Sequence, residues 1–360
     1  MKIMTVLGTR PEIIRLSILI ERLDLAVDHV LVHTDQNSDP MLSRQFFEEL
    51  GVRAPDHHLG LAPASLGHRI GQVLAGVDDL LRTESPDRLV LLGDTDSALC
   101  ALVAKRSGIP VVHLEAGNRC FDDRVPEEVN RRVIDHCSDL LLPYTARSRE
   151  HLIAEGIPSS RIVVLGNPIN EVMLRHAGRR NASDVLERLG LERGGYAIVT
   201  AHRQENVDDP ERLRSIGRAL AVVSEQLRIP VVVSVHPRTR DRLSREGVSW
   251  DTAAVRTCPP LGFSDFVALE EHARLALTDS GTVQEECCIL GVPAVTIRDT
   301  TERPETVECG SNIVCGVEPD DVLEASLRQV GRSGWTVPPE YLATDVSAKA
   351  AALATGPLEF

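Results

Sequence analysis

Short runs of apolar and β-branched residues alternate with longer amphipathic stretches along the first half of the chain. A short apolar run bounded by turn residues is typical of a buried strand, whereas apolar residues three and four positions apart indicate a helix. The predicted strands are Lys2–Leu7, Asp28–Thr34, Arg88–Leu92, Val111–Leu114, Asp139–Pro143 and Arg161–Leu165. Strands that alternate with helices form βαβ units, so this pattern predicts a parallel, doubly wound sheet.

The pattern is interrupted at Gly166-Asn167-Pro168, and a second series of the same kind follows. Its predicted strands are Tyr196–Thr200, Val231–Val235, Leu275–Thr278 and Val292–Ile297, with helices that open near Pro210, Ser264 and Gly281. Since 360 residues exceed the size at which a single core stops growing, two domains are expected. We therefore predict an α/β fold of two Rossmann-like, doubly wound domains, 1–168 and 169–338, that face a central cleft. The remaining residues, 339–360, are expected to pack back on the first domain through one helix over Pro339–Ala354.

Composition and charge argue against nucleic acids and membranes as partners. The formal net charge is −14, whereas proteins that bind a phosphate backbone are net basic or strongly patched. No apolar run is long enough to cross a bilayer, and the chain opens on a predicted strand with no leader before it, so a cytoplasmic protein is expected. The eight cysteines lack CxxC spacing and the twelve histidines do not cluster, so neither a disulfide framework nor a metal site is predicted. The pair His57-His58 is interpreted as a chance neighbour pair in a polar turn.

Acidic residues and a histidine follow the predicted strands. Asp94 and Glu115 each come at the end of a strand, Glu127 follows soon after in the chain, and His202 follows the first strand of the second series. In open parallel sheets such positions face the ligand crevice, and acid–base catalysis needs at least two titratable groups near one centre. Each residue taken alone also has an ordinary structural explanation. Asp94 suits a helix N-cap, Glu115 a strand-end turn, and Glu127 and Glu128 the first turn of a helix.

Seven segments in fixed order resemble the motifs of the non-hydrolysing UDP-N-acetylglucosamine 2-epimerases, from residue 4 to about residue 316. They are Gly8-Thr9-Arg10-Pro11-Glu12, Gly93-Asp94-Thr95, Glu115-Ala116-Gly117, Pro126-Glu127-Glu128-Val129-Asn130-Arg131, Ala201-His202-Arg203, Asp279-Ser280-Gly281 and Arg298-Asp299-Thr300-Thr301-Glu302-Arg303-Pro304-Glu305. The resemblance implies a glycosyltransferase-B-like fold, a homodimer, and inversion of C2 of UDP-GlcNAc to give UDP-ManNAc. It implies no cofactor and no metal.

The resemblance also implies a reaction path and a set of site residues. UDP leaves C1 while a base removes the C2 proton, and UDP then adds back to the 2-acetamidoglucal with protonation on the opposite face. Asp94, Glu115 and Glu127 are the implied catalytic acids and His202 the fourth member, with the division of labour among them open. The implied UDP-binding residues are Gly8, Arg10, Ser280, Gly281, Glu286 and Arg303. For Arg303 a surface salt bridge is the alternative, and for His236 a role as an ordinary loop histidine is preferred.

Two segments depart from the common pattern of the family. Asn37 stands where most relatives have a histidine near the substrate, and in many bacterial members the same segment contributes to an activator site for a second UDP-GlcNAc, so activation by substrate is in doubt here. The segment Asn118-Arg119-Cys120-Phe121-Asp122 is closer to relatives that act on UDP-2-acetamido-2,6-dideoxyhexoses in N-acetylfucosamine synthesis. UDP-GlcNAc is the preferred substrate, with such a 6-deoxy sugar as the alternative. A hydrolysing variant that releases ManNAc and UDP, and a glycosyltransferase-B-type sugar transferase, are the further alternatives.

Overall fold

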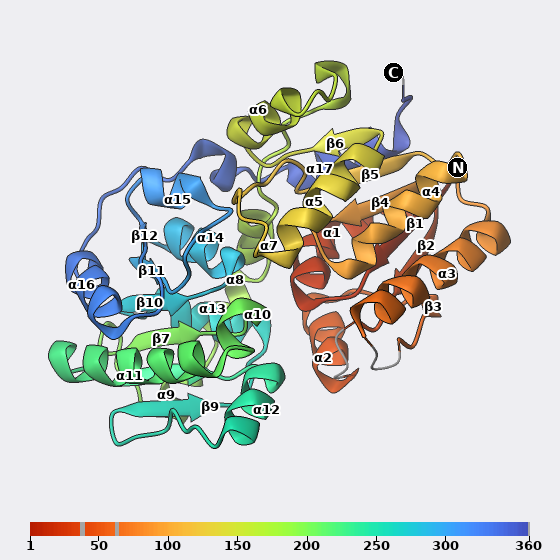
Figure 1. Ribbon diagram of the computed structural model, residues 1–360. Coiled ribbons are helices and arrows are strands. Elements are labelled where there is room, and N and C mark those ends of the chain that lie inside the picture. The colour runs from red at the N-terminus through yellow and green to blue at the C-terminus, as the bar shows by residue number, and fades with distance from the viewer. Residues whose placement is uncertain (37–39, 62–64, 359–360) are drawn as a thin grey trace. The chain divides into compact units, whose positions relative to one another are not determined.

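A computed structural model describes residues 1–36, 40–61 and 65–358 of the protein (Figure 1). The chain divides into two compact units. The first comprises Met1–Val172 together with Glu340–Phe360, and the second comprises Met173–Pro339. No helix in these described ranges is long and apolar enough to cross a membrane.

The first unit is built on a six-stranded parallel sheet with the strand order β3-β2-β1-β4-β5-β6. Its strands are β1 (Lys2–Leu7), β2 (Asp28–His33), β3 (His57–His58), β4 (Arg88–Leu92), β5 (Val111–Leu114) and β6 (Leu140–Leu142). The direction of winding reverses between β1 and β4. In open α/β sheets the carboxyl ends of the strands at such a switch point form the ligand crevice.

Two groups of helices pack on this sheet. The helices of the first unit are α1 (Arg10–Ala26), α2 (Pro40–Leu50), α3 (Leu66–Glu84), α4 (Ala101–Arg106), α5 (Pro126–Cys137), α6 (Ala146–Ala154), α7 (Ile169–Arg175) and α17 (Val346–Thr355), with the 3₁₀ helices η1 (Asp96–Cys100), η2 (Ser159–Arg161) and η3 (Pro339–Leu342). Helix α1 packs against α2 and α17, whereas α3, α4 and α5 form a group that lies in front of the strands in Figure 1. The last helix is tied to the sheet where Arg88 Nη1 donates to the Ala354 carbonyl at 2.6 Å.

The second unit repeats the same topology with different strands. Its parallel sheet has the order β12-β11-β10-β7-β8-β9, so that β7 and β10 flank the switch point as β1 and β4 do in the first unit. The strands are β7 (Ala197–Thr200), β8 (Val231–Ser234), β9 (Val255–Cys258), β10 (Leu275–Thr278), β11 (Ala294–Thr296) and β12 (Asn312–Val314). The helices are α8 (Ala177–Asn181), α9 (Val185–Leu189), α10 (Gln204–Val207), α11 (Pro210–Leu227), α12 (Pro237–Glu246), α13 (Phe263–Glu271), α14 (Gly281–Leu290), α15 (Pro304–Glu308) and α16 (Pro319–Gln329).

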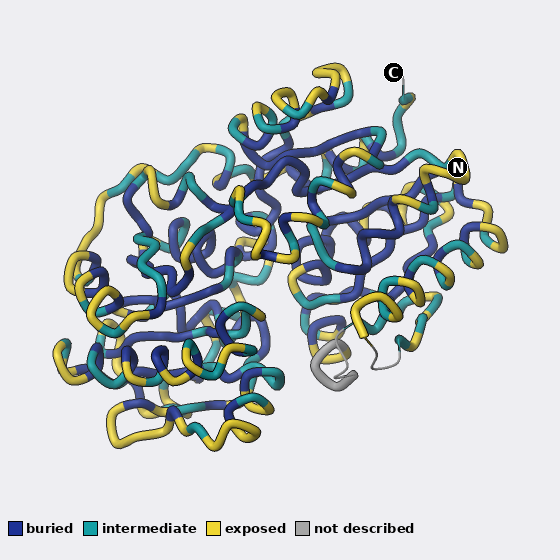
Figure 2. Tube along the Cα trace, viewed as in Figure 1, coloured by how far each residue is buried: buried dark blue, intermediate teal, exposed yellow. Residues whose placement is uncertain are grey.

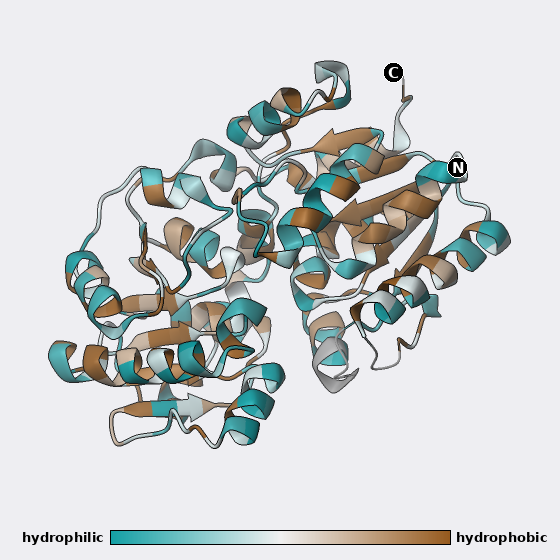
Figure 3. Cartoon of the chain, in the orientation of Figure 1, coloured by the Kyte–Doolittle hydropathy of each residue, from teal (hydrophilic) through white to brown (hydrophobic). Residues whose placement is uncertain are grey.

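The central strand β7 of the second sheet is apolar on both faces, and helices cover both faces. On β7, Ala197 and Val199 pack into a core with α11 and α16, while Ile198 belongs to a separate core with α9, α13 and α14. This alternation follows from the period of two residues in a strand. Most strands of both units are accordingly buried in Figure 2 and hydrophobic in Figure 3.

The sequence pattern predicts the two doubly wound sheets correctly, and the α/β fold class is confirmed. The predicted strand Arg161–Leu165 is wrong, because Arg161 ends η2 and Ile162 forms only an isolated bridge to Leu141. The single helix predicted over Pro339–Ala354 is also wrong, since η3 and α17 divide this stretch. The pattern missed β3, β9 and β12, which are short or polar strands with few apolar residues to mark them.

Gly117 provides a test of the packing behind the first sheet. It has φ +77°, and a Cβ there would lie 2.2 Å from the Ser148 carbonyl oxygen. We expect Gly117→Ala to lower the free energy of unfolding by about 2–4 kcal/mol, through backbone strain and overpacking. Gly71→Ala is the matched control, because Gly71 lies in α3 with nothing near its missing Cβ. That variant should gain roughly 0.5–1 kcal/mol from helix propensity. Urea unfolding followed by circular dichroism measures both, and equal stabilities of the two variants would contradict the packing described.

Candidate active site

Asp94 lies at the switch point of the first sheet, in the turn that follows β4. Its Oδ2 accepts a hydrogen bond from Arg131 Nε at 2.8 Å, and Arg131 Nη2 forms an ion pair with the same oxygen at 2.8 Å. The side chain of Arg131 is 3% exposed and that of Asp94 is 20% exposed. A buried guanidinium therefore fixes the Asp94 carboxylate, which still reaches the surface of the unit. The N-cap of η1 is Thr95, and the alternative explanation of Asp94 as an N-cap is therefore wrong.

Glu115 is buried at the end of the neighbouring strand, β5. Its φ of +66° lies in the left-handed region, which a residue with a Cβ adopts only where the surroundings fix it. The carboxylate pairs with the guanidinium of Arg15 and accepts hydrogen bonds from Tyr144 Oη at 3.1 Å and Asn118 Nδ2 at 3.2 Å. The ring of Tyr144 also lies 5.7 Å from the Arg15 guanidinium carbon. Glu115 is thus part of a strand-end turn, which is the ordinary structural explanation considered for it. Its buried carboxylate also contacts three donor side chains, those of Arg15, Tyr144 and Asn118.

Helix α5 presents two consecutive acids on its first turn, and they lie in different surroundings. Glu128 is fully buried and accepts hydrogen bonds from the backbone N–H groups of Cys120 and Phe121, at 3.0 and 3.1 Å. It also accepts one from Arg131 Nη1 at 2.8 Å. Burial alone would raise the pKa of Glu128, but the Cys120 N–H and the Arg131 guanidinium hold that pKa below its ordinary value. Glu128 therefore anchors the preceding loop, and the half-buried Glu127 is the acid of this pair that reaches the surface of the unit.

Arg15 and Arg131 are site residues that sequence reasoning missed. Arg131 connects Asp94 with Glu128, and Arg15 holds Glu115. Their signal in the sequence is a charged residue on the apolar face of a helix, since both lie among buried positions of α1 and α5. Such a residue is almost always paired when it is buried.

A second buried network supports the same two turns from inside the sheet. His113 Nε2 donates to the Gly93 carbonyl at 2.8 Å, and Nδ1 contacts Asp135 Oδ1 at 2.9 Å. Asp135 also accepts from the Gly117 N–H at 3.1 Å and pairs with Arg119 at 2.8 Å. The turns that carry Asp94 and Glu115 are thus fixed to each other through β5 and α5.

Glu12 closes the start of α1, beside Gly8 and Arg10, which the resemblance implies as UDP-binding residues. The N–H groups of Gly8 and Thr9 donate to Glu12 Oε2 at 3.0 and 2.8 Å, and Thr95 Oγ1 donates to Oε1 at 3.0 Å. These N–H groups are therefore already bonded within the protein, as in a capping box. Gly8 is required for packing, because a Cβ there would lie 2.1 Å from the Thr34 hydroxyl oxygen. Arg10 is partly exposed beside Phe46, at 5.7 Å from the ring centre.

In the second unit Asp279 joins the ends of β7 and β10 at the switch point. It is fully buried and accepts from the N–H groups of His202 and Arg203, at 2.8 and 2.9 Å, and from Asn206 Nδ2 at 3.1 Å. The His202 ring is about one-third exposed, with Nδ1 3.4 Å from Asp279 Oδ1. His236 caps α12 by accepting from the Arg238 N–H at 3.2 Å, and its ring lies 5.6 Å from that of His202.

The first turns of α14 meet a buried group of acids and arginines. Ser280 is the N-cap, and a Cβ at Gly281 would lie 2.7 Å from Glu302 Oε1, so only glycine fits beside that carboxylate. Arg303 is buried and pairs with Glu285, which rules out the surface salt bridge considered for it. Glu286 is also buried on this helix. The arrangement leaves Ser280 and the exposed part of His202 at neighbouring strand ends of one sheet.

A cluster of two histidines and an aspartate lies at the ends of β2 and β3. His33, Asp35 and His58 place three potential metal-ligating atoms within 4.8 Å of one another, but Asp35 Oδ1 contacts both rings, at 2.7 and 3.0 Å, so hydrogen bonds account for the group. Asn37, on which the expectation about activation rests, lies outside the described residues.

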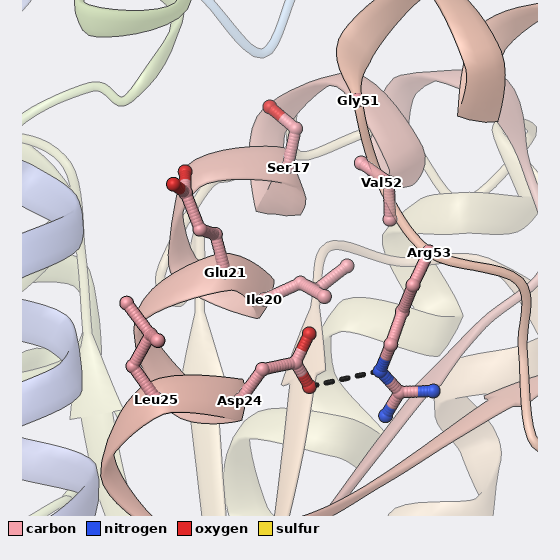
Figure 4. Close-up of a pocket in the computed structure, with 8 residues that line it drawn as sticks. All are labelled: Ser17, Ile20, Glu21, Asp24, Leu25, Gly51, Val52 and Arg53. Atoms are coloured by element: carbon pink, nitrogen blue, oxygen red, sulfur yellow. Dashed lines mark hydrogen bonds and ion pairs between the residues drawn. The ribbon is translucent and has the colours of Figure 1, made fainter.

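The hollow of Figure 4 is lined by the C-terminal half of α1 and by Gly51–Arg53, with Asp24 paired to Arg53 at 2.9 Å. It is therefore remote from the N-terminal end of α1, where the acids gather.

Comparisons with known proteins agree on one family. A family model described as UDP-N-acetylglucosamine 2-epimerase matches residues 21–342. The UDP-N-acetylglucosamine 2-epimerase of Methanocaldococcus jannaschii is 39% identical over 335 residues, 90% of this chain and 91% of the relative. The UDP-2,3-diacetamido-2,3-dideoxy-D-glucuronate 2-epimerase of Pseudomonas aeruginosa is 36% identical over 339 residues, 92% of this chain and 93% of the relative. Among solved structures, M. jannaschii UDP-GlcNAc 2-epimerase in complex with UDP-GlcNAc and UDP matches with a TM-score of 0.94 at 36% identity, covering 99% of both chains.

Glu12 generates a prediction about stability and pH. Burial raises its pKa from 4.5 to about 7, against the opposing hydrogen bonds of Thr9, Gly8 and Thr95. Between these pH values the folded protein holds a proton that the unfolded chain has released. The contribution of protonated Glu12 is therefore fully present below about pH 4.5 and is lost as the pH rises through about 7.

The Glu12→Gln variant cannot titrate and lacks this contribution. From pH 5 to pH 8 the free energy of unfolding of the wild type should fall relative to that of the variant by about 2–3 kcal/mol. Urea titrations at both pH values measure the difference, with Glu21→Gln, an exposed acid on the same helix, as the control. A constant difference between wild type and Glu12→Gln across this range would contradict the account.

Proposed function

The chain belongs to the UDP-N-acetylglucosamine 2-epimerase family, and on that premise we propose that it interconverts UDP-GlcNAc and UDP-ManNAc by inverting C2 of the sugar. It is an isomerase, and the resemblance seen in the seven motifs is confirmed. The observation that carries the proposal is the set of carboxylates at consecutive strand ends of the first sheet. The carboxylate of Asp94 pairs with the buried guanidinium of Arg131, and that of Glu115 pairs with the buried guanidinium of Arg15. Glu127 lies on α5, the helix that carries Arg131.

The chemistry explains why several acids are needed. The C2 proton of this sugar is not α to a carbonyl and is only weakly acidic. A base that removes it sends the C–H electrons into a C1–C2 double bond while the C1–O bond breaks and UDP leaves. In the return step a phosphate oxygen of UDP attacks C1 and a proton is delivered to C2 on the opposite face. Carbon and oxygen keep their overall oxidation states, so no redox cofactor is required.

The surroundings of the acids support different roles. Asp94 and Glu127 are partly exposed and are the proposed groups for proton transfer to and from C2. Glu115 is buried against Arg15, Tyr144 and Asn118, donors that favour its ionised form. We assign it to the electrostatics of the site, where a fixed carboxylate stabilises the positive charge that develops at C1.

Nucleotide binding is assigned mainly to the second unit. His202 and the N-cap Ser280 follow the two strands at its switch point, where ligands bind in open α/β sheets. We propose that His202, Ser280 and Gly281 contact the diphosphate and that Glu286 accepts hydrogen bonds from the ribose hydroxyls. Arg303 supports this group by pairing with Glu285. In the first unit Arg10 supplies positive charge, and Gly8, whose N–H donates to Glu12, permits the close packing of its turn.

A different UDP-amino sugar is the second candidate substrate. The 36% identical P. aeruginosa relative is named for epimerisation of a UDP-diacetamido-glucuronate, and the Asn118–Asp122 segment favours a 6-deoxy sugar. Proton NMR of a panel containing UDP-GlcNAc, its 6-deoxy analogue and the diacetamido-uronate distinguishes them through the coupling constant of H1 with H2. A C2 epimer from UDP-GlcNAc at the highest kcat/KM supports the proposal. Free ManNAc and UDP as sole products would instead indicate the hydrolysing variant, and transfer only to an acceptor would indicate a glycosyltransferase.

We also propose, from the family resemblance, that the chain acts as a homodimer in the cytoplasm. Light scattering of the purified protein measures its mass, and a particle of one chain at working concentration would contradict the dimer. Cell fractionation tests the compartment.

Loss of either proton-transfer acid should slow the reaction without unfolding the protein. Asp94→Asn and Glu127→Gln should each lower kcat by roughly 10²–10⁴-fold. Asp123→Asn is the control, because Asp123 is an exposed acid of the loop between Glu115 and Glu127 and pairs with the partly exposed Arg132, at 3.0 Å. It should keep kcat within about twofold of wild type, since exposed ion pairs contribute little. Near-normal turnover in either site variant, with thermal unfolding matched to the control, would remove that residue from the mechanism.

The elimination route needs neither a metal nor a nicotinamide nucleotide. Exhaustive dialysis against a chelator, followed by treatment with charcoal to strip nucleotides, should leave kcat unchanged within error. Activity that disappears and returns on addition of a divalent cation or NAD would overturn the mechanism. Measuring the metal content of the dialysed enzyme by mass spectrometry provides the control for complete removal.

A further inference from the structure

Two cysteine thiols meet where α14 packs against α15. Cys288 lies on the last turn of α14, and Cys309 is the residue that follows α15. Their Sγ atoms are 3.7 Å apart, although the two residues are 21 positions apart in the chain. A disulfide joins its sulfur atoms at about 2 Å, so a movement of less than about 2 Å brings these two to bonding distance. Neither residue has a place in the mechanism described above.

The backbone around Cys309 permits this small movement. Helix α15 has only five residues, and Gly310 follows Cys309 with a φ of +87°. The end of a short helix gives way more easily than the middle of a long one. Cys288 is held more firmly, because its neighbour Cys287 packs in a hydrophobic core of the second unit. The approach of the two sulfur atoms therefore falls mainly on Cys309.

The two thiols differ in their access to solvent. Cys309 is half-buried, whereas Cys288 is completely buried. Burial raises the pKa of the Cys288 thiol to about 12, against the opposing hydrogen bond of Ser311. The Sγ atom of Cys309 lies 3.4 Å from the Thr306 carbonyl oxygen and 3.4 Å from the Ser311 hydroxyl oxygen. A dissolved oxidant therefore reaches Cys309 first, and Cys288 is placed to react second.

An ion pair already joins the same two helices. Arg303, the N-cap residue of α15, pairs with Glu285 of α14. Glu285 and Cys288 are three residues apart and so lie on one face of α14. A bond between Cys288 and Cys309 would close residues 288–309 into a loop. Helix α15 would then be held to α14 at both of its ends.

We propose that Cys288 and Cys309 are a reversible disulfide site, which a peroxide oxidises and which links α14 to α15. The inference is independent of the proposed function. Both cysteines are free in the structure, which is the state that a thiol reductant such as glutathione maintains.

The chemistry balances with hydrogen peroxide as the oxidant. The Cys309 sulfur attacks one peroxide oxygen, the O–O bond breaks, and the thiol proton leaves with the departing hydroxide as water. The Cys288 sulfur then attacks the sulfenic sulfur of Cys309. The S–O bond breaks as the S–S bond forms, and the Cys288 proton leaves with the hydroxyl group as a second water. The two thiols lose two electrons, and the peroxide gains them.

Peptide mass mapping of the reduced protein after treatment with hydrogen peroxide tests the site. In the wild type, Cys288 and Cys309 should appear in one linked pair of peptides, and a thiol reductant should release them. The Tm should rise by roughly 3–8 °C on oxidation, because the link restricts the unfolded chain. Cys309→Ser should show neither change. Cys315→Ser is the matched control, a half-buried cysteine of the same unit with Sγ 3.6 Å from the Thr296 carbonyl oxygen, and it should behave as the wild type.

Cys288→Ala tests the order of the two steps. Without the second thiol, the sulfenic acid at Cys309 should persist and react with dimedone, whereas the wild type should give roughly 10-fold less of this adduct. A wild type that keeps both thiols while glutathione in the same sample is oxidised would overturn the proposal. So would a disulfide that joins either cysteine to a different one, or a linked protein with an unchanged Tm. An unmodified Cys309 in Cys288→Ala would overturn its assignment as the first thiol to be oxidised.

Discussion

The candidate catalytic centre depends on one physical constraint, the pairing of buried carboxylates with guanidinium groups at the carboxyl ends of a parallel sheet. Arg131 is the central example, because one buried side chain holds Asp94 after β4 and Glu128 on α5. Removing it would take away the buried cation that pairs with Glu128 and leave that carboxylate with the partly exposed Arg132, at 3.3 Å, at a cost of several kcal/mol. The loop over residues 118–121 would lose its anchor as well, since Glu128 accepts two of its backbone N–H groups. The position of Asp94 is therefore inseparable from the fold of the unit.

The two units solve the same topological problem with different chemistry. Both sheets have the same strand order and place polar residues at the switch point. In the first unit these residues are acids paired with arginines, an arrangement suited to proton transfer. In the second, Asp279 accepts backbone N–H groups of the β7–α10 turn and fixes His202, while the acids of α14 lie deeper in the interior. A shared topology thus permits one unit to act on the sugar and the other to hold a nucleotide, as proposed.

Sequence reasoning performed best where a local signal is strong. Lys2–Leu7 and Arg88–Leu92 are strands with the predicted bounds, because uninterrupted apolar runs leave no alternative. The motif acids could also be placed at strand ends. Their partners could not, because Arg15 and His113 meet the site through tertiary contacts between segments distant in sequence. Glu12 illustrates the same limit: the resemblance implies Gly8 as a UDP-binding residue, whereas the structure shows the N–H groups of Gly8 and Thr9 bonded to the Glu12 carboxyl group of the following helix.

The central claim is that the carboxylates of the first unit exchange the C2 proton of a UDP-sugar while the C1–O bond opens. Its most direct test combines heavy water with UDP-GlcNAc carrying ¹⁸O at the oxygen that bridges C1 and the diphosphate. The account predicts deuterium at C2 of the product and migration of the ¹⁸O label to non-bridging phosphate positions, both at rates comparable to epimerisation. Both signals should fall together in Asp94→Asn. Epimerisation with full retention of the C2 hydrogen, or with the label fixed in the bridge, would contradict the account.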